Sequence, residues 1–273
     1  MKFPAELPQC SISSSCNKAV LSVRQMLLLG IIAGAYISLG AFLVTTVTRD
    51  LVPIIGAGLT SFVSGAIFPV GLILIVLGGG ELFTGNCLMV TACIAKGIKA
   101  RQVLRNWFWV YVANFIGALL LVVLVYLSGL LDGSMAVRAL EIATAKVNLS
   151  FSEIFFRGIL CNWLVALAVW MAAAALSVPG KVIMLWIPVM AFVTGSFEHC
   201  IANMYFLSAG LLANANAAVV AASSIVPEKL AALTPMGCVA NLVAATLGNI
   251  VGAVVLVGML YYAAYKRQNE PEA

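Results

Sequence analysis

Charge is scarce in this sequence. Asp, Glu, Lys and Arg make up 9% of the 273 residues, whereas an ordinary soluble domain has about 25%. Hydrophobic residues make up 63%, and the mean hydropathy is +1.10. The apolar residues come in blocks near the length of a bilayer span, about 20 residues. This composition argues against a soluble fold and predicts an all-α polytopic membrane protein.

The sequence also lacks the motifs of common enzymes and metal sites. Its seven cysteines include no Cys-x-x-Cys pair, so we expect neither a disulfide framework nor a metal site. No His-Glu-x-x-His, Gly-x-Ser-x-Gly or Gly-rich phosphate loop occurs. The net charge of +5 is scattered over the ends of apolar blocks, which indicates a topogenic role and not a nucleic-acid partner. We therefore expect no enzyme activity and no cofactor.

Six apolar blocks predict six transmembrane helices, of which the second and the fifth are too long for one straight span. Three consecutive glycines (78–80) interrupt the second block, and Pro188 and Gly195 interrupt the fifth. Non-helical backbone at membrane depth survives only where it is buried in protein or lines a cavity. Helices 2 and 5 are therefore predicted to be broken. The expected spans are 26–47, 60–94, 103–129, 154–176, 182–213 and 236–265.

The basic residues predict the orientation of a single transmembrane domain, 1–273. An even number of spans places both termini on one side, and that side carries ten Lys and Arg residues against five on the other. The positive-inside bias then makes residues 1–24 and 266–273 cytoplasmic segments. The polar connection after the third span, which carries Lys146, is expected on the outer side.

The two halves of the chain resemble each other. Each half has three spans, so the repeats must have opposite orientations. Inverted repeats with broken helices at matching places point to a transport site near the middle of the membrane. The matched residues are Gly30 with Gly158, Glu81 with Glu198, Asn86 with Asn203, and Asn114 with Asn249.

His199, the only histidine, lies with Glu198 inside the fifth block. Ionisable groups at such depth are costly and are by default candidates for a conduction or binding site. His199 is a candidate to donate a hydrogen bond to an anion or to carry a proton, with a purely structural histidine as the alternative. A Cys-His enzyme is not indicated, because Cys200 adjoins His199 and neighbouring helical residues point apart.

Other polar residues near the breaks have candidate roles. Glu81 and Glu198 stand beside glycine-containing breaks and are predicted to cap half-helix N-termini. The Thr84 hydroxyl either faces the pathway or donates a hydrogen bond back to a carbonyl oxygen of its own helix. Lys146 either attracts anions or is a solvated charge. Three asparagines are expected to satisfy the broken backbone, namely Asn86, Asn162 and Asn203.

Four segments resemble the signatures of the formate/nitrite transporter family, which includes hydrosulfide channels. They are GGELFTGN (79–86), GILCNWLVALAVWMA (158–172), FEHCIANMYF (197–206) and NLVAATLGNIVGA (241–253). The resemblance covers nearly the whole chain, whereas the Asn-Pro-Ala loops of aquaporins and the paired histidines of ammonia channels are absent. It implies an aquaporin-like homopentamer in the plasma or inner membrane, with one pore in each protomer.

The resemblance also implies roles for single residues. His199 matches the central pore histidine, Thr84 the threonine that faces it, and Lys146 a vestibule lysine. Asn162 and Asn203 lie on the same pathway. Two hydrophobic constrictions are implied, a cytoplasmic-side one of Leu72, Leu82, Phe83 and Val165 and an outer one of Phe68 and Phe192.

Such a pore predicts electroneutral passage of a small monovalent anion together with a proton. A bare anion meets a desolvation barrier at apolar constrictions, whereas the neutral acid escapes most of it. Formate ranks first because the family is most often associated with it. Nitrite and hydrosulfide are alternatives, and a non-conducting membrane protein is a remote one.

Overall fold

The computed structural model describes residues 1–265, so the predicted C-terminal tail, 266–273, lies outside the described residues. Within them the chain is helical and contains no strand. The elements are η1 (Pro4–Glu6), α1 (Leu7–Ala19), α2 (Val23–Thr48), α3 (Val52–Ile67), α4 (Val70–Gly78), α5 (Phe83–Asn86), η2 (Cys87–Met89), α6 (Val90–Ile94), α7 (Ala100–Leu127), α8 (Gly133–Val147), α9 (Phe151–Ala172), α10 (Val178–Thr194), α11 (Cys200–Asn214), α12 (Ala217–Ala222), α13 (Pro227–Leu230), α14 (Pro235–Ala253), η3 (Val254–Met259) and α15 (Leu260–Tyr265).

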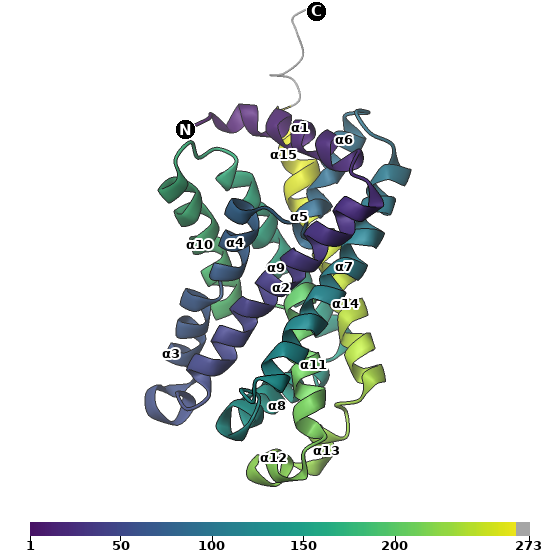
Figure 1. Ribbon diagram of the computed structural model, residues 1–273. Coiled ribbons are helices and arrows are strands. Elements are labelled where there is room, and N and C mark those ends of the chain that lie inside the picture. The colour runs from purple at the N-terminus through teal and green to yellow at the C-terminus, as the bar shows by residue number, and fades with distance from the viewer. Residues whose placement is uncertain (266–273) are drawn as a thin grey trace, which may run out of the picture.

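Five helical stretches are long and apolar enough to cross a membrane. They are α2, α3 with α4, α7, α9, and α14 with η3 and α15. The predicted fifth span consists instead of two shorter apolar helices, α10 and α11. Figure 1 shows these helices side by side in one bundle, with α1 lying across one end and α8, α12 and α13 at the other. We call these ends the α1 side and the α8 side.

Both predicted breaks are present. In the first half, α4 ends at Gly78, and Gly79 has a φ of +87°. In the second half, α10 ends at Thr194, and Ser196 has a φ of +56°. Glycine adopts this left-handed region freely, but a residue with a Cβ is strained there. Ser196 therefore holds a turn that the first half builds with glycine.

The second span begins earlier than the predicted residue 60, because α3 begins at Val52. Pro53 lies in the first helical turn, where its missing N–H costs nothing. The helix continues past a kink at Gly56, whose φ is +76°. A further interruption at Phe68 and Pro69 separates α3 from α4.

The predicted polar connection between the third and fourth spans is mostly the amphipathic helix α8. Asp132 caps its N-terminus by accepting a hydrogen bond from the Gly133 N–H at 2.8 Å. Its apolar face is buried against α11, and Lys146 lies in its last helical turn. That face consists of Met135, Ala136, Ala139, Leu140 and Ala143. The N-terminal segment likewise folds, as α1, against η2 and α6.

Small residues let the long helices of each half approach closely. α2 packs along α7, and α9 packs along α14. A Cβ placed on Gly117 would overlap the Ile31 carbonyl oxygen, and one on Gly248 would overlap that of Phe155. Such backbone contact is the usual role of small residues between membrane helices.

We expect Gly117→Ala to destabilise the fold, because the added methyl group must part α2 from α7. Overpacking of this kind costs about 1–3 kcal/mol. Thermal unfolding of the purified protein in detergent measures the effect. The matched control is Gly58→Ala, where an added Cβ meets nothing within 4 Å. Equal melting temperatures for the two variants would contradict the close packing.

Candidate functional site

A buried carboxylate next to the first break organises a ring of polar side chains on the α1 side. Glu81 accepts hydrogen bonds from Lys18 Nζ at 2.5 Å and from Asn86 Nδ2 at 2.7 Å. Asn86 Nδ2 also donates to Asn106 Oδ1 at 2.8 Å, and Asn106 Nδ2 donates to the Lys18 carbonyl oxygen at 3.5 Å. The buried charge of Glu81 is thus paired and hydrogen-bonded, as a buried ion must be.

The second half repeats this ring on the α8 side. Glu198 accepts from Lys146 Nζ at 2.8 Å and from Asn203 Nδ2 at 2.6 Å. Asn203 Nδ2 also donates to Asn241 Oδ1 at 2.8 Å, and Asn241 Nδ2 donates to the Lys146 carbonyl oxygen at 3.1 Å. The two rings match atom for atom and lie at opposite ends of the bundle. This supports the inverted repeat.

The predicted capping role of Glu81 and Glu198 is wrong, because the N-cap residues of α5 and α11 are Leu82 and His199. The two carboxylates bind side chains. Asparagines on α7 and α14 support the broken backbone instead. Asn114 Oδ1 accepts from the Phe83 N–H at 3.0 Å, and Asn249 Oδ1 accepts from the Cys200 N–H at 2.9 Å. A carboxamide suits this position because its oxygen accepts a hydrogen bond while its nitrogen donates others.

The carboxamide nitrogens complete the support of the two breaks. Asn114 Nδ2 donates to the carbonyl oxygens of Gly30 and Glu81, at 2.8 and 2.9 Å. Asn249 Nδ2 donates to those of Gly158 and Glu198, both at 2.8 Å. Each asparagine therefore links its own helix to two other segments. Asn114 links α7 to α2 and to the first break, and Asn249 links α14 to α9 and to the second break. The sequence repeat marks both asparagines but does not indicate this role.

His199 joins the two broken elements. Its Nε2 lies 3.2 Å from Thr84 Oγ1, and its Nδ1 accepts a hydrogen bond from the Ala202 N–H at 3.1 Å. His199 is thus also the N-cap of α11. Because Nδ1 accepts, the proton of the neutral ring must be on Nε2. Asn162 lies beside this pair and donates to the carbonyl oxygens of Thr84 and Asn249.

The predicted constriction residues are all buried in one hydrophobic core. The rings of Phe68 and Phe192 meet edge to face with centroids 5.7 Å apart. Phe192 also stacks on His199 at 5.8 Å. Phe83 packs edge to face against Tyr111 at 4.9 Å. The other three, Leu72, Leu82 and Val165, are 1–3% exposed.

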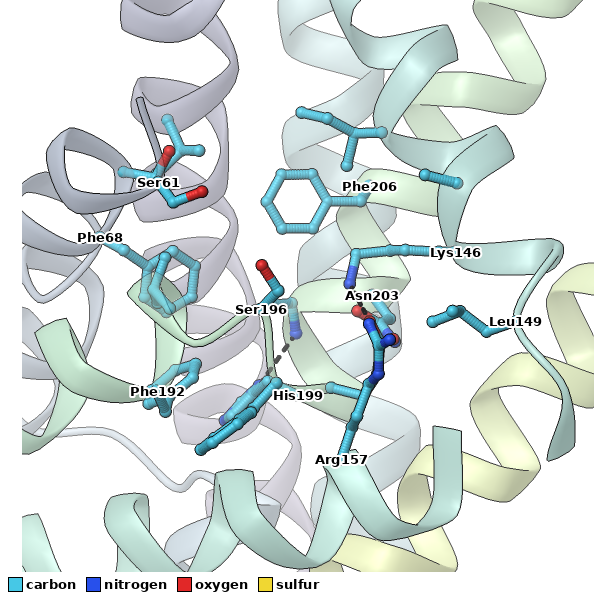
Figure 2. A pocket seen from close by; sticks show the side chains of 18 of the residues that line it. Ser61, Phe68, Lys146, Leu149, Arg157, Phe192, Ser196, His199, Asn203 and Phe206 are labelled. Atoms are coloured by element: carbon cyan, nitrogen blue, oxygen red, sulfur yellow. Dashed lines mark hydrogen bonds and ion pairs between the residues drawn. The ribbon is translucent and has the colours of Figure 1, made fainter. Parts of the chain in front are cut away.

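A cavity of about 380 Å³ opens on the α8 side and reaches His199. Figure 2 shows Phe68 and Phe192 on one wall and Lys146 on the other. Lys146 Nζ lies 5.6 Å from the centre of the Phe206 ring. Arg138 and Arg157, which the sequence does not single out, also line the cavity. A smaller cavity of about 80 Å³ lies under α1 and is lined in part by Lys18.

Two buried carboxamide oxygens accept no hydrogen bond from residues 1–265. They are Asn162 Oδ1 and Asn203 Oδ1, and Asn203 lines the larger cavity. An unpaired buried acceptor is costly.

No cluster of metal-ligating side chains occurs in the described part of the chain, and all seven cysteines are free thiols.

The chain matches known proteins over nearly its whole length. Residues 7–263 fit a family described as formate/nitrite transporter. The formate channel BtFdhC of Bacillus thuringiensis is 37% identical, over 97% of this chain and 96% of that protein. The formate channel FocA of Escherichia coli K12 is 36% identical, over 98% and 96%. A solved pentameric formate channel with formate bound superposes with a TM-score of 0.78 at 34% identity, over 89% of this chain and 98% of that one.

These relatives are channels, not enzymes. The apolar helices make this chain a multi-pass membrane protein. It belongs to the formate/nitrite transporter family.

Proposed function

We propose that the chain forms a homopentameric channel that carries formate across the cell membrane together with a proton. The pore runs through each protomer, past Thr84 and His199, and both termini are cytoplasmic. The observation that carries the proposal is the contact between these two side chains, which joins the two broken elements at the end of the cavity. The relatives named as formate channels support the choice of substrate.

Apolar side chains on the path favour a neutral species. Phe68 and Phe192 border the cavity next to His199. A carboxylate that passes them loses its water, which costs roughly several kcal/mol or more. The same desolvation raises the proton affinity of the anion, so it crosses as the acid. The further apolar set, Leu72, Leu82, Phe83 and Val165, is proposed to form the second barrier.

Polar groups along the path suit both forms of the substrate. His199 Nε2–H donates to Thr84 Oγ1 and can exchange this bond for one to a substrate oxygen, and the Thr84 hydroxyl still has its own proton to donate. The unpaired oxygens of Asn162 and Asn203 are available to accept the acid proton of the neutral form. Nitrite and hydrosulfide are also conjugate bases of small weak acids, so the same path admits them.

The hydrogen bonds of His199 favour water as the source of the proton. A neutral imidazole has one proton, and its acidic form needs a second one on Nδ1. That atom already accepts from the Ala202 N–H, so protonation would break the cap of α11. We infer that His199 orients the substrate by donating from Nε2 and stays neutral during transport.

Formate flux into proteoliposomes tests the proposed function. We expect uptake to rise as the external pH falls and to be unaffected by a potassium diffusion potential, because anion and proton enter together. Internal pH reported by a trapped dye should fall in step with uptake. Thr84→Val should slow this flux because it removes one substrate hydrogen bond. Uptake that follows the membrane potential would contradict proton coupling, and no flux above that of empty liposomes would contradict the function.

Nitrogen-15 NMR of reconstituted protein tests the protonation of His199. The chain has a single histidine, so a tag without histidine leaves one imidazole signal. We expect the neutral Nε2–H tautomer throughout the pH range in which formate is transported. A protonated Nδ1 in that range would rule out the capping hydrogen bond.

The variant His199→Asn separates the two candidate roles of this side chain. Asparagine is a good N-cap, so α11 should keep its start. We expect slower formate uptake with an unchanged dependence on pH, because the proton comes from water. Loss of the pH dependence would instead assign the proton to His199.

A further inference from the structure

Five charged side chains line the larger cavity, and four of them form two ion pairs. Arg138 Nη1 donates to Glu141 Oε2 at 2.9 Å, and Lys146 Nζ donates to Glu198 Oε1 at 2.8 Å. The fifth, Arg157, makes no side-chain hydrogen bond or ion pair with any residue in 1–265. The pairs cancel, so the net charge of the cavity wall is the single positive charge of Arg157.

Glu153, one helical turn earlier on α9, does not neutralise this charge. It forms no ion pair with Arg157, and its carboxylate accepts from Ser150 N–H at 2.8 Å and Ser150 Oγ at 2.7 Å. These bonds form the capping box at the start of α9. Glu153 is exposed to solvent, which screens its interaction with Arg157.

Arg157 is well placed to meet an anion that enters the cavity. Its side chain is half-buried, and its carbonyl oxygen accepts from the Glu198 N–H at 3.4 Å, directly beside the second break. Figure 2 shows the guanidinium rising from α9 into the cavity toward Lys146. A charge between partly apolar walls attracts a counter-ion more strongly than one in open water.

The chemistry of the guanidinium group adds selectivity to this attraction. Its planar fork matches two acceptor oxygens at once, whereas an ammonium acts as a point charge. Formate and nitrite each present two oxygens in one plane, and hydrosulfide presents a single sulfur. A fork therefore favours the first two anions.

We propose that Arg157 is the docking site for the entering anion and that its fork selects planar two-oxygen anions, formate and nitrite, over hydrosulfide. This inference rests on the proposed function and deepens it. Lys146, the expected attractor of anions, is bound to Glu198 and holds that buried carboxylate in place. The charge that collects the substrate is on α9, not on α8.

Concentration-dependent uptake by Arg157→Gln and Arg157→Lys tests the proposal, with formate, nitrite and hydrosulfide as substrates. For Arg157→Gln we expect the half-saturating concentrations of formate and nitrite to rise about tenfold at low salt. The limiting rate should change little, because the apolar barriers lie deeper in the pore. Arg157→Lys keeps the charge without the fork. Loss of the charge in Arg157→Gln also raises the half-saturating concentration of hydrosulfide, and Arg157→Lys should return that value to the wild-type one. The half-saturating concentrations of formate and nitrite in Arg157→Lys should stay several-fold above those of the wild type.

The matched control is Arg49→Gln. Arg49 is exposed, pairs with Asp50 at 3.2 Å and lies outside the cavity, so its removal should change no half-saturating concentration. Wild-type values in Arg157→Gln would overturn the docking role. Equal recovery of all three anions in Arg157→Lys would overturn the selectivity. A wild-type protein that conducts none of the three anions would instead contradict the proposed function itself.

Discussion

An interrupted helix inside an apolar layer has unpaired N–H and C=O groups that no water reaches, and this constraint governs the structure. Each such group costs several kcal/mol if it stays unpaired. Asn114 and Asn249 meet the constraint from neighbouring helices, since each accepts from one freed N–H group and donates to carbonyl oxygens on two segments. Hydrogen bonds from neighbouring helices therefore hold both breaks, and the side chains that follow them, Thr84 and His199, lie within hydrogen-bonding distance of each other.

The polar rings next to the breaks add a second layer of support. A carboxylate with a lysine on one oxygen and an asparagine on the other occurs once in each half. Breaking such a buried pair typically costs about 3–5 kcal/mol. The rings thus anchor α1 and α8, which lie outside the long helices, to the broken elements. The two breaks and these two helices form one connected structure.

Much of this arrangement follows from the sequence, and the rest depends on contacts between distant segments. Apolar block length and the glycines at 78–80 predict the membrane fold and the first break, because both are local properties. The lysine partner of Glu81, Lys18, lies 63 residues away and that of Glu198, Lys146, lies 52 residues away, and no local pattern indicates either of them. The helix α8 has a clear amphipathic period, but its charged residues, Arg138, Glu141 and Lys146, favour the interpretation as a polar connection. Arg157 can be recognised as an unpaired charge only when the structure shows that the other charged residues of the cavity form ion pairs.

The two halves of the inverted repeat differ in charge at the cavity. Gly30 corresponds to Gly158, so Leu29 stands in the first half where Arg157 stands in the second. The cavity under α1 is lined by one charged residue, Lys18, and that charge is cancelled by Glu81. A passive pore cannot change the equilibrium between two compartments, but its two mouths can fill at different concentrations. With an unpaired cation at the cavity on the α8 side and none lining the cavity under α1 within residues 1–265, the pore would saturate at a lower anion concentration on the α8 side than on the α1 side.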